Sequence, residues 1–253
     1  MVLSGLGQLH IDLALEKLHR KFGADVLLHT PKIPYRETLH ATSRAQGKFK
    51  KQTGGHGQYG DCWLEVEPLP RGQGFIFQNH VVGGAIPRNF IPAVEKGVVE
   101  AMHEGVLGGY PVVDVRVTVY DGSFHTVDSS EMSFKIAGSM AMKKAMEAAH
   151  PVLLEPMMTV EIDAPTEAIG TVMGDLSGRR GRILSVSAHD HEERITALVP
   201  LAELLKYAPA LNGMTGGRGS YVMEFARYDE VPRELAGRII EQHKADRQAV
   251  AVH

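Results

Sequence analysis

Residues 50–60 constrain the fold of this chain more than any other stretch, because they place four glycines between two segments of different character. A basic segment, residues 44–51, precedes the glycines, and an alternating apolar segment begins at Cys62. Residues 44–60 contain four Lys or Arg and no Asp or Glu. Glycine lets a backbone approach a partner closely, and basic side chains attract phosphates. The pattern predicts a hairpin whose glycine-rich loop contacts an RNA backbone, with a plain flexible loop as the alternative.

Two other interpretations of these glycines fail on their context. The spacing Gly55-x-Gly57-x-x-Gly60 fits a dinucleotide fingerprint, which requires an apolar strand before it and a helix after it. Here a basic segment precedes the glycines, and residues 63–67 alternate with the period of a strand. No Gly-Lys-Ser/Thr follows, so the loop is not a P-loop either.

Composition limits the class of protein. A length of 253 residues with 43% apolar residues suits two domains and a smaller appendage. The net charge of −3 requires any phosphate-binding surface to be local. The single cysteine, Cys62, excludes a disulfide framework and predicts a buried, inert thiol in a reducing compartment. The sequence shows no signal peptide and no run of about 18 apolar residues, so we expect a cytoplasmic protein.

Hydrophobic periodicity predicts an α+β chain. A helix over residues 8–22 carries Ile11, Leu15, Leu18 and Phe22 on one face, and a strand follows over residues 25–29. Because one helix with two strands cannot form a complete sheet, we expect this N-terminal piece to be incomplete. Antiparallel strands are predicted over residues 36–41, 44–51, 62–68 and 75–81. A helix from residue 87 to about 105 follows, and then a regular strand over residues 112–120.

A second loop is predicted over residues 121–127, and a helix follows it. Asp128, with Glu131 three residues later, fits a capping box. The helix has an apolar stripe of Phe134, Ala137, Ala141, Ala145 and Ala148. Residues 157–228 are predicted to run strand, helix, strand, strand, helix, strand, which is the order of ferredoxin-like domains. A last helix ends near residue 246, and a disordered tail follows.

Several polar groups could carry chemistry or binding. Asp121, His125 and Asp128 could suggest acid–base catalysis, but an exposed His125 beside Ser123 is better placed to contact a partner. His189 and His191 resemble a metal pair without a third ligand, so a solvated loop is the preferred interpretation. Arg179 and Arg180 follow a helix, where they either complement its dipole or contact RNA.

An ordered set of longer motifs resembles translation elongation factor G. The motifs are residues 4–10 (SGLGQLH), 34–38 (PYRET), 54–60 (GGHGQYG), 83–87 (GG-x-IP), 120–131 (YDGSFH-x-VDSSE), 174–181 (GDL-x-x-RRG) and 199–203 (VPLAE). The resemblance covers the chain from residue 1 to about residue 242. At residue 56 the chain carries histidine where the main elongation factors carry arginine, which is more similar to the elongation-factor-G-like paralogues.

The resemblance implies an α+β map. Residues 1–33 correspond to the second half of domain III, an incomplete βαβ piece. Residues 34–152 correspond to domain IV, with a ribosomal-protein-S5-like fold and a left-handed βαβ crossover. Residues 153–230 correspond to the ferredoxin-like domain V, and residues 231–246 to a C-terminal helix, before a disordered tail at 247–253.

The resemblance also implies a function, namely tRNA–mRNA translocation on the ribosome by a monomeric factor that meets no membrane. Domain IV would enter the decoding region of the small subunit, and domain V would face the factor site of the large subunit. The expected tip contacts are Lys50, Lys51, Gly54, Gly55, His56, Gly57, Gln58, Tyr59, Ser123 and His125; Arg179 and Arg180 are expected to contact rRNA.

The family's GTPase domain has no counterpart in the sequence. No cofactor is therefore expected in this chain, and GTP and Mg would belong to that domain. Ribosome protection or recycling is the alternative within the same superfamily. A small-molecule enzyme built on Asp121 and His125 is the remote alternative, and it predicts a deep pocket around His125.

Overall fold

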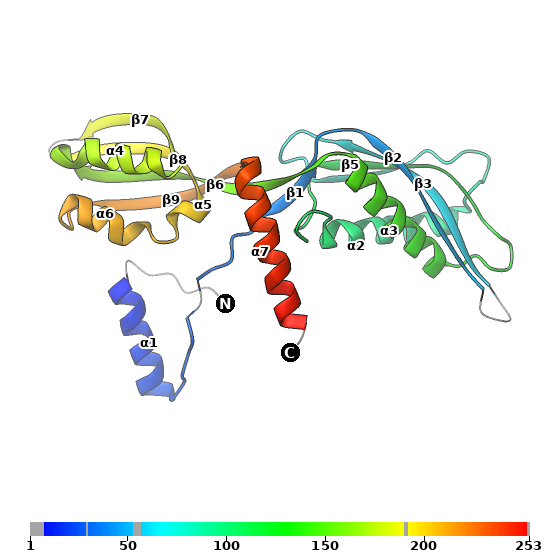
Figure 1. Cartoon of the computed structure of the whole chain (residues 1–253), viewed down its shortest axis with the longest axis horizontal. Helices are drawn as coiled ribbons and strands as arrows, with labels where there is room; N and C mark the ends of the chain where they lie inside the picture. The colour runs from blue at the N-terminus through cyan, green and yellow to red at the C-terminus, as the bar shows by residue number, and fades with distance from the viewer. Residues whose placement is uncertain (1–7, 29, 53–56, 190–191, 252–253) are drawn as a thin grey trace. The chain divides into compact units, whose positions relative to one another are not determined.

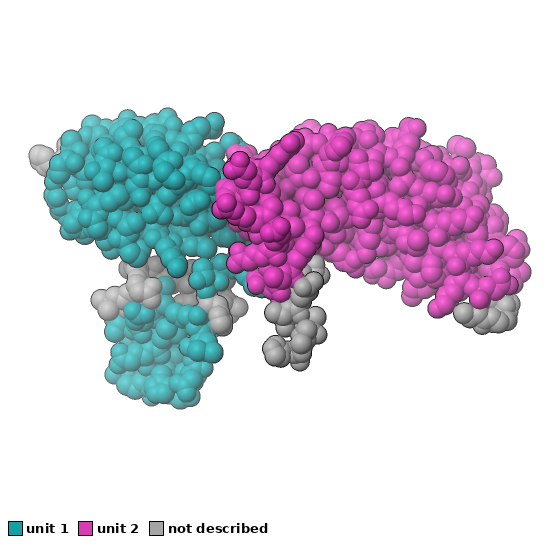
Figure 2. All heavy atoms as spheres, in the orientation of Figure 1, with its two compact units in different colours: residues 1–34, 156–227 teal, residues 35–155, 228–253 magenta. Residues whose placement is uncertain are grey.

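The structure, a computed structural model, describes residues 8–28, 30–52, 57–189 and 192–251 (Figure 1). The chain forms two compact units, each assembled from two segments (Figure 2). Unit 1 comprises residues 1–34 and 156–227, and unit 2 comprises residues 35–155 and 228–253.

The N-terminal helix forms as predicted, whereas the strand after it does not. Helix α1 (Gln8–Phe22) ends where the Gly23 amide donates to the His19 carbonyl at 2.8 Å, with Gly23 at φ 60°. This left-handed residue is the glycine C′ that helices favour. The predicted strand is wrong for residues 25–28, because no described strand pairs with them. Residue 29 lies outside the described residues.

Unit 2 is built on a four-stranded sheet with the order β2-β3-β5-β4. Its strands are β2 (Ser43–Lys51), β3 (Gln58–Pro68), β4 (Phe75–Asn79) and β5 (Val115–Ser123). Strand β4 runs parallel to β5, so the prediction of antiparallel strands is wrong there. The physical reason is the connection between these two strands. A short 3-10 helix (Arg88–Phe90) and α2 (Ile91–Glu104) lie between them, and such a crossover permits parallel pairing.

Helices α2 and α3 (Glu131–Ala148) pack side by side against one face of this sheet (Figure 1). Gly47 of β2 makes the close approach possible, since a Cβ there would lie 1.9 Å from the Ala137 carbonyl oxygen of α3. The predicted stripe of α3 is buried except Ala148, which is exposed at the last position of the helix. Cys62 lies in this core, and burial raises the pKa of its thiol to about 12, as expected of an inert cysteine.

Strand β1 (Arg36–Leu39) is separate from that sheet and pairs with the first residues of β6 (Pro151–Pro165). Its Glu37 is fully buried, and the carboxylate accepts five successive backbone amides at 2.7–3.1 Å, those of residues 106–110. The same loop receives the C-terminal helix. His243 donates to the Gly108 carbonyl at 2.6 Å and stacks on Tyr110 with ring centroids 4.3 Å apart.

The C-terminal helix α7 (Arg233–Ala251) is longer than predicted. The expected end at residue 246 and the expected disorder of residues 247–251 are both wrong, because the helix continues through these residues. Residues 252 and 253 lie outside the described part of the chain.

Unit 1 confirms the predicted order of strand, helix, strand, strand, helix, strand. The elements are β6, α4 (Ile169–Gly178), β7 (Arg182–His189), β8 (Glu192–Pro200), α6 (Tyr207–Thr215) and β9 (Ser220–Glu230). A 3-10 turn (Thr166–Ala168) precedes α4, and a short helix, α5 (Leu201–Leu204), precedes α6. The sheet order is β9-β6-β8-β7, and one core cluster, including Val160, Ile195 and Leu176, joins this sheet to its helices.

Candidate nucleic-acid interface

The first predicted loop lies at the end of the β2–β3 hairpin. The register pairs Lys50 with Tyr59 and Lys51 with Gln58, so β3 begins four residues earlier than the expected start at Cys62. Lys50, Lys51 and Gln58 are exposed. Gly54, Gly55 and His56, all candidate contact residues, lie outside the described residues.

The second loop lies beside the first because β5 is longer than predicted. Residues 121–123 belong to the strand instead of a loop, and Ser123 pairs with Asp61 of β3. A bulge opposite Trp63 and Leu64 shifts the register of β5 on the way. The chain then returns past the hairpin, where the Tyr59 amide donates to the Asp128 carbonyl at 2.8 Å. Two loops far apart in sequence therefore meet at one end of unit 2.

The Asp128 carboxylate joins the two loops directly. One oxygen accepts the Gly57 amide at 3.0 Å, and the other lies 3.3 Å from Nδ1 of His125. A Cβ on Gly57 would lie 2.9 Å from the Asp128 carboxyl carbon, so a larger residue would displace this carboxylate. The prediction that Asp128 caps α3 is wrong. Ser130 is the N-cap, and its hydroxyl accepts the Ser133 amide, which leaves Asp128 available for the other loop.

Hydrogen bonds inside the sheet fix the base of these loops. The Ser123 hydroxyl donates to the Asp61 carboxylate at 2.6 Å, and the other Asp61 oxygen accepts from Gln46 at 2.8 Å. Because the single Ser123 proton is used on that carboxylate, the Tyr59 hydroxyl must donate to the Ser123 oxygen, at 2.7 Å. Asp61 is only 5% exposed, so these bonds satisfy a buried carboxylate. We call Gly57, Tyr59, Ser123, His125 and Asp128 the tip cluster.

Three exposed lysines of β2 lie near the tip cluster without an ion-pair partner in the described part of the chain. Within the described residues, no carboxylate lies within ion-pair distance of Lys48, Lys50 or Lys51. Arg44, further from the loops, pairs with Glu65. The His125 side chain is 57% exposed, and its neighbours Phe124 and Val127 are exposed as well. An exposed, cationic surface built on hydrogen-bonded backbone suits a polyanion better than a small molecule.

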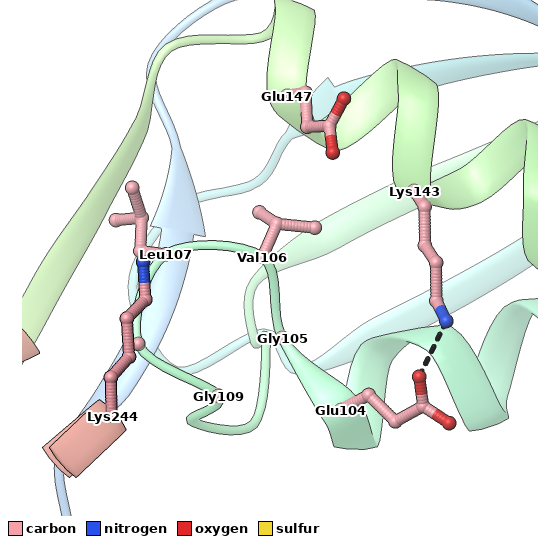
Figure 3. Close-up of a pocket in the computed structure, with 9 residues that line it drawn as sticks. Glu104, Gly105, Val106, Leu107, Gly109, Lys143, Glu147 and Lys244 are labelled. Carbon is pink, nitrogen blue, oxygen red and sulfur yellow. Dashed lines mark ion pairs between the residues drawn. The ribbon is translucent and has the colours of Figure 1, made fainter. Parts of the chain in front are cut away.

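Two pockets of the described structure lie away from the tip cluster. One of about 520 Å³ is lined by the loop of residues 104–109, Lys143 and Lys244, with an ion pair of 2.5 Å between Lys143 and Glu104 (Figure 3). A second pocket lies between α2 and α3. His125 lines neither of them, and the Asp121 carboxylate accepts the amide of its neighbour Gly122. Neither of these two pockets is the deep one that an enzyme built on Asp121 and His125 would need.

Arg179 and Arg180 lie in unit 1, at the end of α4. Arg179 donates to the Asp175 carboxylate at 2.7 Å and to the Glu203 carbonyl at 3.0 Å. Arg180 donates to the Glu203 carboxylate at 3.1 Å and has a φ of 58°. Both side chains are half-buried, and the Asp175 hydrogen bond raises the pKa of Arg179. These arginines hold the turn against the next helix, a role that sequence alone left open.

The residues that connect the two loops carry little signal in the sequence. Asp128 fits a capping box by spacing, and Asp61 and Gln46 belong to no motif. The signal that could have identified Asp128 is the neighbouring Ser130, an equally good N-cap two residues later. Of the predicted metal pair, His189 is the last residue of β7 and His191 lies outside the described residues. The described residues contain no group of three or more metal-ligating side chains.

Comparison with known proteins gives consistent matches over most of the chain. The family described as "Elongation factor G, domain IV" matches residues 31–150, and that described as "Elongation factor G C-terminus" matches residues 152–239. A curated relative, the elongation factor G-like protein of Thermotoga maritima, is 53% identical over 248 residues, or 98% of this chain. A crystal structure from Thermus thermophilus matches with a TM-score of 0.85 and 48% identity over 95% of this chain.

The chain spans 36% of the length of each of these two matches. Among the described residues, no helix is long and apolar enough to cross a membrane.

Proposed function

This chain belongs to the elongation factor G family, and we propose that it is the ribosome-engaging, C-terminal region of such a translation factor. In this proposal the tip cluster enters the decoding region of the small subunit and holds the tRNA–mRNA duplex during translocation. One observation carries it: two loops bonded together by Asp128 are flanked by lysines without carboxylate partners among the described residues.

The mechanism is steric and electrostatic. Lys50 and Lys51 attract the phosphate backbone, while exposed Gln58 and His125 offer hydrogen bonds to sugar and phosphate oxygens. Gly54, Gly55 and Gly57 let the backbone approach the duplex closely, and His56 of the same loop offers a further hydrogen bond. Tyr59 and Ser123 keep the loops in register. Such a surface reads the shape of a duplex and not its sequence.

The domain assignment is part of the proposal. We assign residues 34–152 to a domain IV of ribosomal-protein-S5-like fold with a left-handed crossover, and residues 153–230 to a ferredoxin-like domain V. The sheet order β9-β6-β8-β7 supports the second assignment. Residues 1–33 are assigned to the second half of domain III. Because the matched relatives are much longer, we place GTP hydrolysis and its Mg in the longer factor and expect no cofactor in this chain.

The remaining contacts follow from the same proposal. Unit 1 faces the factor site of the large subunit, and the factor acts as a cytoplasmic monomer. Arg179 and Arg180 already bond to Asp175 and Glu203, so their first role is to stiffen a turn, and rRNA contact comes second. Ribosome protection or recycling would use the same surfaces and is the alternative function.

Ribosome co-sedimentation over a salt series tests the proposal. We expect saturable binding whose logarithm falls linearly with the logarithm of salt concentration. Replacing Lys48, Lys50 and Lys51 by Gln should lower that slope by about two to three, since each lost phosphate contact removes about 0.7–0.9.

A matched variant provides the control. Lys96, Arg238 and Lys244 are exposed basic residues on α2 and α7 of unit 2, and their replacement by Gln removes the same net charge. We expect this variant to keep the slope of the parent chain. Equal losses in the two triple variants would mean that the tip makes no particular contact, and the assignment would be wrong.

A further inference from the structure

The second face of the unit 2 sheet carries a pattern that shares Tyr59 with the tip cluster and continues beyond it. Helices α2 and α3 pack on one face, which receives the buried side chains Leu64, Val66, Val117 and Val119. We call the opposite face of β2-β3-β5-β4 the open face. Cross-strand partners lie on the same face, so Gln46 with Trp63, Lys48 with Asp61 and Lys50 with Tyr59 all belong to it.

Three aromatic rings follow one another on the open face. Tyr59 and Trp63 lie on β3, four residues or about 13 Å apart along the strand. The bulge in β5 puts Tyr120 on the same face, and its ring centroid lies 6.4 Å from that of Trp63. All three side chains are half-exposed, so their rings are available at the surface.

Cations alternate with these rings. The Lys48 ammonium lies over the Tyr59 ring at 5.7 Å, and the Arg44 guanidinium lies over the Tyr120 ring at 5.6 Å. Lys50 lies opposite Tyr59 in the next strand. The acidic groups of this part of the face each have a partner: Asp61 accepts from Ser123 and Gln46, Glu65 pairs with Arg44, and Asp121, opposite Trp63, accepts the Gly122 amide. Lys48 and Lys50 have no carboxylate partner in the part of the chain that the structure describes.

We propose that the open face is a stacking platform for unpaired RNA nucleotides, with Tyr59, Trp63 and Tyr120 taking bases and Lys48, Lys50 and Arg44 taking phosphates. The proposal rests on the function proposed above and adds a second surface, which binds single strands and not a duplex. Aromatic faces stack only on bases that are free of a duplex.

The chemistry of the face selects this partner. Stacking of a base on an aromatic ring is worth more than an exposed cation–π contact. A base can therefore displace the cation from the Tyr59 and Tyr120 rings, and the cation then moves to the adjoining phosphate. Lysine is depleted at protein–protein interfaces, whereas unneutralised lysines between aromatic rings are typical of single-strand binding surfaces.

Trp63 is the only tryptophan of the chain, so its fluorescence reports directly on the proposed site. We would titrate the chain with a single-stranded oligouridylate of about 12 nucleotides, within the range of single-strand site sizes, and with an RNA duplex of the same length. We expect saturable quenching by the single strand and little quenching by the duplex. Absence of quenching by the single strand at low salt would overturn the proposal, as would equal quenching by both.

Variants separate stacking from charge. Tyr120→Leu should weaken oligouridylate binding about tenfold, while Tyr120→Phe keeps the ring and should bind normally. Lys48→Gln should lower the salt slope by about 0.7, and Lys96→Gln, on α2 across the sheet, should leave it unchanged. Circular dichroism melts would verify folding. Equal effects of Lys48→Gln and Lys96→Gln, or unchanged binding of Tyr120→Leu, would contradict the platform.

The ribosome assay keeps the two proposals distinguishable. Oligouridylate quenching without ribosome binding would leave the platform standing and reject the proposed function. Ribosome binding without quenching would reject the platform alone.

Discussion

Asp128 joins two loops with one side chain. Its carboxylate receives the Gly57 amide and the His125 ring, while its backbone carbonyl receives the Tyr59 amide. We expect Asp128→Ala to weaken ribosome binding about fivefold, because about 1 kcal/mol is lost when the loops are no longer held together. The measurement is the co-sedimentation titration at one fixed salt concentration.

Asp121 provides a control that separates position from charge. It lies near the end of β5, and its carboxylate accepts the adjacent Gly122 amide, a bond within its own strand. Both alanine variants remove one negative charge near the RNA, which by itself strengthens binding to a polyanion. Asp121→Ala should therefore bind as well as the parent chain or better. If Asp128→Ala also bound better, the connecting role of Asp128 would be rejected.

At the scale of elements, Glu37 connects β1 to the loop between α2 and β5. Five amides converge on its buried carboxylate, and α7 rests on the same loop through His243. Glu37→Gln replaces one carboxylate oxygen by an amide nitrogen. This nitrogen donates hydrogen bonds and would face the backbone amides that the oxygen accepted. We expect a loss of about 2–4 kcal/mol in the free energy of unfolding, measured in urea, and faster amide exchange in α7.

An exposed glutamate gives the comparison for this prediction. Glu147 is on the surface of α3, and Glu147→Gln should change stability by less than about 0.5 kcal/mol. If the two glutamine variants had similar unfolding curves in urea, the negative charge of Glu37 would not be needed to hold the five amides in place.

Elements were predictable where a repeating apolar pattern decides the structure. Helices α1, α2 and α3 and the element order of unit 1 follow from such patterns. Strand ends were less predictable, because Gln58 and Ser123 carry no pattern and join their strands through partners across the sheet. The parallel pairing of β4 with β5 likewise depends on which segments of the chain lie beside it. The same holds for residues 25–28, which form no strand. The lysines and glycines of the hairpin were recognisable, whereas the Asp128 connection required the fold.

At the scale of the whole molecule, the proposed function separates RNA contact from nucleotide hydrolysis. His125 is exposed on the tip cluster, and hydrolysis would take place in another part of the longer factor. In that longer factor, His125→Ala should slow translocation about fivefold, the effect of losing one hydrogen bond of about 1 kcal/mol, and leave GTP hydrolysis nearly unchanged. Translocation and multiple-turnover GTP hydrolysis would be measured on the same ribosomes. The control is His103→Ala, because His103 is exposed in the last turn of α2 and belongs to neither loop. Equal loss of both activities in His125→Ala would place this residue in factor docking instead of duplex contact.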